Sequence, residues 1–332
     1  MKTPSTPASR KVPVTILTGF LGAGKTTLLN RILRERHGER IAVIENEFGE
    51  AGVDNDLLLT SGDEQIVEMN NGCICCTVRG DLVRILGELR QRREAAPGAF
   101  DRVIIETTGL ADPAPVAQTF FIDDDIAAYY ALDAIVTVVD AKHAPTQLDE
   151  CHEAAEQVAF ADRILLSKTD LVSALERERL RARLVRINPR AAIAAVDFGQ
   201  TPIADLLDIG GFSLDSILEI EPGFLGEDQH EHDDAVRSFV FTSAAPLDPG
   251  RLQAFFREAI AAHAKDLMRY KGIVAFEGLA HRVVLQGVHM LMNSDIGRPW
   301  AEGEARESKL VFIGRNLPHD EFAASLARCR VS

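Results

Sequence analysis

The sequence predicts an α/β protein with a mainly parallel sheet, followed by a smaller α+β domain. Two observations lead to this fold class. Through the first two-thirds of the chain, short and almost wholly apolar runs alternate with amphipathic stretches, as expected for parallel strands that helices cover on both faces. Beyond about residue 199 the composition shifts to proline, glycine and charged residues, and a second, shorter series of strands and helices follows.

Six apolar runs are predicted as the strands of the first domain, because each has the length and composition of a buried strand. They are Val12–Thr18, Ile41–Glu45, Gln65–Met69, Arg102–Thr107, Ala134–Asp140 and Arg163–Ser167. Helical patterns cover Thr27–Arg36, which Gly38 closes, and Asp81–Arg93. Asp112 followed by Pro113 is typical of a helix start, where aspartate caps the first turn and proline takes its first position.

The second domain is predicted as a small α+β sandwich. Its elements are a strand, a helix, three strands and a last helix: Val236–Thr242, Pro249–His263, a strand near Gly272–Phe276, Arg282–Gly287, Lys309–Ile313 and Asp320–Arg328. The predicted organisation is therefore a tail over 1–11, a first domain over 12–200, a linker over 201–235 and a second domain over 236–332.

Composition and charge argue against several classes of protein. Hydrophobic residues make up 46% of the 332 residues and charged residues 26%, which is typical of a globular chain. The 50 acidic residues outnumber the 36 basic ones, giving a net charge of −14, so we expect no nucleic-acid partner. No uncharged apolar run reaches the ~18 residues of a membrane span, so we expect no membrane partner.

The start of the chain imitates a secretory signal, because basic residues precede a mostly apolar stretch. However, the apolar stretch continues directly into Gly24-Lys25-Thr26-Thr27, where cleavage would destroy a phosphate-binding loop. We therefore predict that the protein has no secretory signal and is cytoplasmic.

Residues Gly19–Thr26 match the phosphate-binding pattern G-x-x-x-x-G-K-[ST] in full, after a predicted strand and at the start of a predicted helix. Glycines let successive backbone N–H groups converge on phosphate oxygens, and the helix N-terminus adds partial positive charge. Lys25 is expected to bridge the β- and γ-phosphates, and the Thr26 hydroxyl to ligate Mg²⁺. The first domain is therefore predicted to be a P-loop NTPase domain.

Two further segments complete the predicted nucleotide site. Glu106 stands at a strand tip and begins Glu-Thr-Thr-Gly; an acid there orders Mg²⁺, and Gly109 lets a backbone N–H approach the γ-phosphate. Ser167–Asp170 follows another strand, and the Asp170 carboxylate can accept hydrogen bonds from guanine but not from adenine N1. The nucleotide is therefore predicted to be GTP, although Ser167 replaces the usual asparagine of N-K-x-D.

The predicted GTP-binding residues are Gly19, Gly22, Ala23, Gly24, Lys25, Thr26, Thr27, Gly109, Lys168 and Asp170. The predicted catalytic residues are Lys25, Thr26 and Glu106, of which Thr26 and Glu106 would hold magnesium.

Three of the five cysteines fall within four positions, at Cys73, Cys75 and Cys76. Adjacent thiols are poor disulfide partners, so a reducing compartment and a bound metal are expected. Thiolates favour Zn²⁺ and Cu⁺, and three of them leave a tetrahedral site open at its fourth position, which suits a protein that hands its metal on. His230 and His232 could gather Zn²⁺ loosely, although a solvated linker is the simpler interpretation.

In this order the motifs resemble those of the CobW family of GTPases, which are relatives of the nickel-enzyme maturation GTPases UreG and HypB. The chain is most similar to the YjiA-like branch, from about residue 12 to its end. The segments that carry the resemblance are the P-loop, Ile44-Glu-Asn-Glu-Phe-Gly49, the three cysteines, Glu106-Thr-Thr-Gly109, Ser167-Lys-Thr-Asp170, Arg269-Tyr-Lys-Gly272, Arg298-Pro-Trp300 and Lys309-Leu-Val-Phe-Ile-Gly314.

The resemblance implies a Mg²⁺-dependent GTPase that carries a transition metal, with zinc the favoured cargo, and passes it to a client metalloprotein. It also implies that Glu45 or Glu50 helps the cysteines to bind the zinc. The hypothesis is a switch in which γ-phosphate and Mg²⁺ hold the loops on either side of the cysteines until hydrolysis of GTP to GDP releases them. Whether the chain forms a homodimer stays open.

Two alternatives also stay open at this point. A P-loop kinase or other phosphotransferase would need an acceptor pocket and an arginine-rich lid, and Asp170 would lose its purpose. A non-catalytic zinc buffer or sensor would use GTP only to stabilise its fold. No glutamine is obviously placed to orient the attacking water, so we expect intrinsic hydrolysis to be slow and stimulated by a partner.

Overall fold

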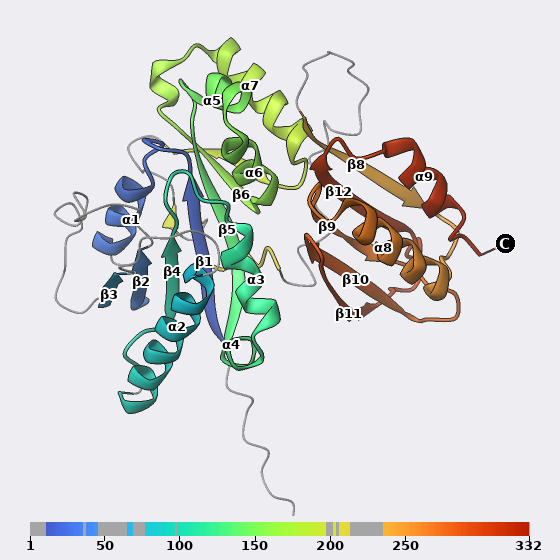
Figure 1. Cartoon of the computed structure of the whole chain (residues 1–332), viewed down its shortest axis with the longest axis horizontal. Helices are drawn as coiled ribbons and strands as arrows, with labels where there is room; N and C mark the ends of the chain where they lie inside the picture. The colour runs from blue at the N-terminus through green and yellow to red at the C-terminus, as the bar shows by residue number, and fades with distance from the viewer. Residues whose placement is uncertain are drawn as a thin grey trace, which may run out of the picture.

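A computed structural model of the chain describes residues 11–35, 38–45, 65–68, 77–96, 98–196, 202–203, 206–212 and 235–331, with only the backbone of 65–68 and 77–79. Two sheets, each with its own helices, lie side by side in this part of the chain (Figure 1). None of the helices that it contains is long and apolar enough to cross a membrane.

The first sheet has seven strands in the order β3-β2-β4-β1-β5-β6-β7, and every neighbouring pair is parallel. Parallel strands bring their carboxyl ends to one edge, where ligands of such sheets bind. The strands are β1 (Val12–Gly19), β2 (Ile41–Glu45), β3 (Gln65–Glu68), β4 (Arg102–Glu106), β5 (Tyr130–Asp140), β6 (Arg163–Ser167) and β7 (Ala192–Ala195).

Helices cover both faces of this sheet, because its buried side chains alternate between two separate apolar cores. Ile104 of β4 packs with Leu29 of α1 on one face, whereas Ile105 packs with Leu86 of α2 on the other. The helices of this domain are α1 (Lys25–Arg34), α2 (Thr77–Ala95), α3 (Ala114–Ile122), α4 (Asp124–Tyr129), α5 (Ala144–Glu150), α6 (His152–Phe160) and α7 (Ala174–Ile187).

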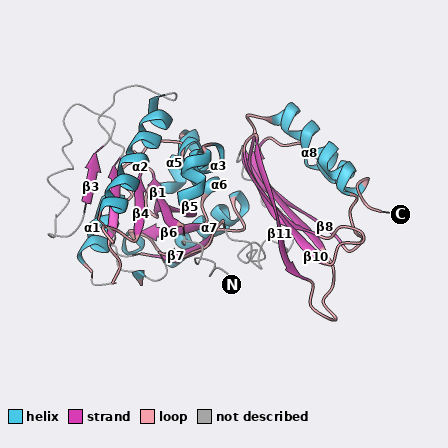
Figure 2. Ribbon diagram, turned by 90° about the horizontal axis from the view of Figure 1, so that it is seen from below, coloured by secondary structure: helices cyan, strands magenta, loops and turns pink. Residues whose placement is uncertain are grey.

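The second sheet is antiparallel, with five strands in the order β11-β10-β9-β12-β8. Helix α8 lies on the side of this sheet away from the first domain (Figure 2), and phenylalanines such as Phe256 and Phe312 fill the space between them. On the other side, Met268, Val288 and Val311 join the core of the first domain. The elements are β8 (Val236–Ser243), α8 (Pro249–His263), β9 (Leu267–Val274), β10 (His281–Val288), β11 (Leu291–Pro299), β12 (Ser308–Arg315) and α9 (His319–Ala327).

The predicted fold class is confirmed, and Ile41–Glu45, Arg163–Ser167 and Pro249–His263 have the predicted bounds. Other boundaries were wrong. β9 starts at Leu267 rather than near Gly272, because its buried charges made that part of the strand look like surface. β11 was missed because it is an exposed edge strand without an apolar pattern, and the short β7 was missed as well.

Part of the segment predicted as a linker, 201–235, packs against the first domain. Ile203, Leu206 and Leu207 are buried in the core on the α1 face of the first sheet. Val236, the first residue of β8, lies in the core of the opposite face. Ile203, Leu206 and Leu207 of this segment therefore belong to packed structure, and β8 begins directly after it.

Candidate nucleotide-binding site

The P-loop connects the end of β1 to the start of α1, at the carboxyl edge of the first sheet. Gly19 and Gly24 have φ values of 143° and 103°, which side chains other than glycine rarely adopt. A Cβ on Gly19 would also lie 2.3 Å from the carbonyl oxygen of Val138 in β5. Only glycine fits there, so the loop can pass close to the neighbouring strand and open toward a ligand.

Lys25, the first residue of α1, is only 9% exposed, and its side chain folds back over the loop. Its Nζ donates hydrogen bonds to the carbonyl oxygens of Gly19 at 2.8 Å and Phe20 at 3.4 Å. Both acceptors are neutral main-chain groups. An anionic phosphate on the loop would attract the ammonium group more strongly, since charge-assisted hydrogen bonds are about twice as strong as neutral ones.

Thr26 and Glu106 come together although 80 residues separate them in the chain. The Thr26 hydroxyl donates a hydrogen bond to Glu106 Oε1 at 3.1 Å, and the carboxylate is 9% exposed at the tip of β4. A hydroxyl and a carboxylate are hard oxygen donors, the kind that Mg²⁺ prefers beside nucleotide phosphates. These two residues therefore fit a magnesium site next to the P-loop.

The loop after β4 packs directly on the P-loop. A Cβ on Gly109 would lie 2.6 Å from the backbone nitrogen of Leu21, so only glycine permits this approach. Gln157 of α6, which is 1% exposed, holds the loop from the other side by donating hydrogen bonds to the carbonyl oxygens of Gly109 and Ala111, both at 3.1 Å. The predicted γ-phosphate loop is therefore tied both to the P-loop and to a helix of the domain.

The base-recognition segment is tied to the P-loop by Ser167. Its hydroxyl donates a hydrogen bond to the carbonyl oxygen of Ala23 at 2.7 Å. The serine at the usual asparagine position thus links the segment to the P-loop, and Ser167–Asp170 lies beside it at the same edge of the sheet. Asp170 follows in a 3₁₀ turn (Thr169–Leu171) and is exposed, so its carboxylate is accessible to a base.

Lys168 is positioned by a residue that the sequence analysis did not single out. Asp140, at the tip of β5 and 2% exposed, accepts a hydrogen bond from Lys168 Nζ at 2.7 Å and contacts His143 Nδ1 at 2.8 Å. Burial acts to raise the pKa of Asp140, but the hydrogen bonds from Lys168 and His143 outweigh it and hold this pKa below its ordinary value. Asp140 is therefore a charged anchor for the lysine.

Replacing Asp140 with asparagine is expected to weaken GTP and GDP binding by about 1 kcal/mol, because the charge-assisted hydrogen bond to Lys168 becomes a neutral one. Titration with a fluorescent guanine nucleotide measures the effect. The matched control is His143→Ala, which removes the more exposed partner of the same carboxylate and should leave affinity almost unchanged. Unaltered affinity in the Asp140 variant would show that the lysine needs no such anchor.

Glu45, predicted as a zinc ligand, lies next to Glu106. The two are Cα partners in the β2–β4 ladder, and both side chains are buried, with Glu45 7% exposed. The other predicted zinc ligands, Cys73, Cys75, Cys76 and Glu50, and the histidines His230 and His232, lie outside the described residues. Within the described ranges, no three His, Cys, Asp or Glu side chains are grouped as a metal site.

The strand-tip rule that singled out Glu106 would also have found Asp140, since both acids end parallel strands at the same edge. No comparable sequence motif pointed to the roles of Ser167 and Gln157. Each acts through a contact with a distant carbonyl group, and only the folded chain brings these groups together.

Fold and site together define a P-loop nucleotide-binding protein. Comparison with protein families matches residues 13–195 to the CobW/HypB/UreG nucleotide-binding domain and residues 236–330 to the cobalamin synthesis protein CobW C-terminal domain. The chain therefore belongs to the CobW/HypB/UreG family, as the resemblance of its motifs indicated.

Individual relatives agree with this membership. The chain is 41% identical to the zinc chaperone YjiA of Escherichia coli, over 96% of this chain and 99% of that protein. It is 35% identical to the zinc chaperone CobW of Pseudomonas aeruginosa, over 95% of this chain and 91% of that one. The crystal structure of Zn(II)-bound YjiA GTPase from E. coli superimposes with a TM-score of 0.77 and 36% identity, covering 97% of this chain and 99% of that one.

Proposed function

We propose that this chain is a cytoplasmic GTPase that binds zinc and delivers it to a client metalloprotein, with the nucleotide state setting the affinity for zinc. Family membership and similarity along nearly the whole chain to two zinc chaperones support the proposal. The observation that carries it is the pairing of Glu45 with Glu106, because it puts a carboxylate proposed for zinc beside the one proposed for magnesium.

For GTP hydrolysis, each group of the site has a distinct role. The Lys25 ammonium group exchanges its carbonyl partners for β- and γ-phosphate oxygens and neutralises the charge that develops during phosphoryl transfer. Thr26 and Glu106 hold Mg²⁺, which supplies further neutralisation when it is bound. Asp170 reads the guanine edge, while Lys168 covers the face of the base from its anchor on Asp140.

For zinc, we propose that Cys73, Cys75 and Cys76 provide three thiolates and that Glu45 or Glu50 provides the fourth ligand. Zinc is a softer ion than those that carboxylates bind best. A ligand of the client protein can therefore displace a carboxylate from the fourth position more readily than a thiolate. The resulting site retains zinc until a client ligand competes for it.

The neighbouring positions of Glu45 and Glu106 account for the link between the two ligands. Glu106 would help to hold Mg²⁺ beside the γ-phosphate, so loss of that phosphate would alter the contacts of Glu106 at the tip of β4. Glu45 is its Cα partner in the β2–β4 ladder. Gln157 anchors the loop after Glu106 on α6, so a change there is confined to a short stretch of chain. Zinc affinity should therefore differ between the GTP-bound and GDP-bound proteins.

Single-turnover GTP hydrolysis, measured with and without Zn²⁺, tests this function. We expect slow hydrolysis of GTP whose rate changes when zinc binds, and loss of that zinc dependence in a Cys73→Ser, Cys75→Ser, Cys76→Ser protein. Cys151→Ser, a substitution at a partly exposed cysteine of the same domain, is the matched control and should keep the dependence. If GTP binds but is not hydrolysed in either metal state, the chain is a zinc buffer or sensor instead.

A further inference from the structure

A cavity of about 390 Å³ lies between the two domains. The first domain contributes residues of α3, α4 and the start of β5, and the second contributes residues of β10 and β11. Lys11 precedes β1 and Tyr130 begins β5, so the cavity is at the amino edge of the first sheet, opposite the edge that carries the P-loop. Cavities of roughly 300–1,000 Å³ between domains are a common location of small-molecule sites.

Most of the cavity wall is apolar, and much of it is aromatic. Phe120 and Phe121 come from α3, and the ring of Phe212 lies 5.7 Å from that of Phe121, measured between centroids. Aromatic walls favour a flat apolar ligand, because rings pack against one another in offset or edge-on arrangements. The rest of the apolar lining is formed by Leu132, Val288, Leu291 and Met292.

One polar side chain in this lining is buried and unpaired. Gln286 of β10 is 6% exposed, and its amide makes no hydrogen bond within the part of the chain that the structure describes. Its Oε1 atom is fully buried. Buried amide groups in folded proteins are nearly always hydrogen-bonded, since leaving one unpaired costs the free energy of removing it from water. Gln286 therefore lacks a partner that a ligand in the cavity could supply.

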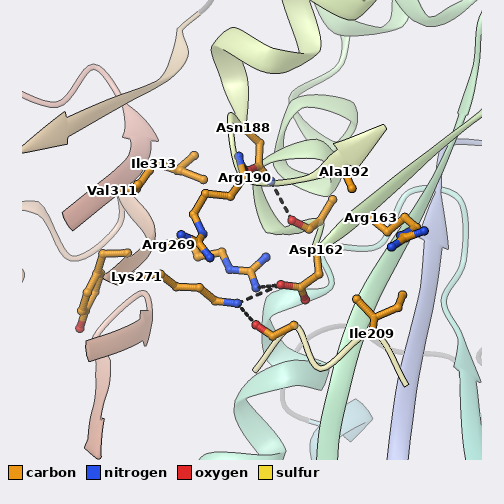
Figure 3. Close-up of a pocket in the computed structure, with 13 residues that line it drawn as sticks. Asp162, Arg163, Asn188, Arg190, Ala192, Ile209, Arg269, Lys271, Val311 and Ile313 are labelled. Carbon is orange, nitrogen blue, oxygen red and sulfur yellow. Dashed lines mark hydrogen bonds and ion pairs between the residues drawn. The ribbon is translucent and has the colours of Figure 1, made fainter. Parts of the chain in front are cut away.

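The neighbours of Gln286 in the sheet do not satisfy it. Lys271 of β9 and Asn293 of β11 are its Cα partners on either side, so the three side chains lie on the same face. Lys271 is directed to Asp162 (Figure 3), to which it donates a hydrogen bond at 2.9 Å. Asn293 Nδ2 donates to Asp295 Oδ2 at 3.3 Å. Both neighbours are thus engaged elsewhere.

The other polar side chains of the lining are paired as well. The Tyr130 hydroxyl donates a hydrogen bond to the carbonyl oxygen of Leu86 at 2.8 Å, and Lys11 Nζ donates one to the carbonyl oxygen of Ala127 at 2.6 Å. Lys11, like Asn293 and Asp295, is exposed, which places these side chains at the rim. The cavity therefore combines an apolar interior, a polar rim and a single unpaired amide.

We infer that this cavity binds a flat aromatic molecule of one or two rings, whose polar group forms a hydrogen bond with the Gln286 amide. The amide can turn about its last single bond and present either its oxygen or its NH₂ group, so a hydroxyl group on the ligand can pair with it. Because the walls come from both domains, the bound molecule would contact both and stabilise their junction.

The test uses the full chain loaded with Mg·GDP, so that guanine already occupies the proposed base site. The probes are 2-naphthol and naphthalene, which share a two-ring body but differ in the hydroxyl group. Equilibrium dialysis measures the affinity and stoichiometry of each. We expect one site per chain, and a preference for 2-naphthol over naphthalene that depends on Gln286.

Gln286→Met is the deciding variant, because methionine keeps the length of the side chain and removes the amide. We expect it to reduce the preference for 2-naphthol by roughly 3- to 10-fold, the effect of one hydrogen bond. Gln253→Met, the same change at an exposed position on α8, is the matched control and should leave the preference unchanged.

A second variant tests the location of the site independently of the hydrogen bond. Ala131 lines the cavity at an exposed position, so Ala131→Trp places a large ring at the rim and should abolish binding of both probes. The inference would be overturned if neither probe binds the unmodified protein, if the preference is unchanged in Gln286→Met, or if Ala131→Trp binds both probes normally.

Discussion

Replacing Lys25 with alanine is expected to reduce single-turnover GTP hydrolysis by at least ~100-fold, while the protein stays folded and still binds zinc. The ammonium group now bonded to the Gly19 carbonyl is the side-chain cation of the P-loop. Without it, the transferring phosphoryl group loses the charge neutralisation that this side chain supplies. The rate is measured with stoichiometric enzyme and GTP, so that product release does not limit it.

Two further variants separate the role of this lysine from a general effect on α1. Arg34→Ala changes an exposed cation at the far end of the same helix, and its hydrolysis rate should equal that of the unmodified protein. Lys25→Arg keeps the charge but not the shape, and should remain strongly impaired. Normal turnover in Lys25→Ala would mean that this side chain does not touch the phosphates.

Replacing Asp170 with asparagine is expected to weaken GTP binding by ~1–3 kcal/mol, because a matched carboxylate acceptor becomes an amide that faces the guanine donors. Xanthosine triphosphate should bind this variant better than it binds the unmodified protein, since its additional carbonyl group can accept a hydrogen bond from the new amide. Competition against a fluorescent nucleotide measures both affinities.

The control for Asp170 is Asp149→Asn, a charge-neutralising change at an exposed position on α5, which should leave both affinities as they are. If the unmodified protein binds ATP and GTP equally well, Asp170 does not select guanine. The alternative of a P-loop phosphotransferase would then need to be reconsidered.

Those parts of the site that depend on local sequence could be predicted. Gly19, Lys25 and Thr26 act through a loop between one strand and one helix, so their spacing alone indicates phosphate binding. Glu106 and Asp170 follow buried strands whose apolar pattern is clear, and parallel strands bring their tips to one edge. Because the apolar pattern of buried strands is clear, most strands of the first domain were predicted close to their observed positions.

Features that depend on contacts between distant segments could not be predicted. β9 was placed too late in the chain because Arg269 and Lys271 look like surface residues, although their pairing with Asp162 of the other domain buries them. β11 lies at a sheet edge, where water takes the place of an apolar neighbour and no periodic pattern is required. Nothing near Ser167 in the sequence indicates the hydrogen bond to Ala23.

The central claim is that GTP and zinc act on one another through neighbouring strand tips, and zinc titration in two nucleotide states tests it most directly. The protein is loaded with Mg·GDP or with a non-hydrolysable GTP analogue, and a competing chelator reports zinc affinity at a single pH, because thiolate binding releases protons. We expect tighter binding in the GTP-like state by roughly 5- to 150-fold, and an equal effect of zinc on nucleotide affinity, as linkage requires. Identical zinc affinities in the two states would contradict the account, leaving a GTPase and a zinc site in one chain without a switch between them.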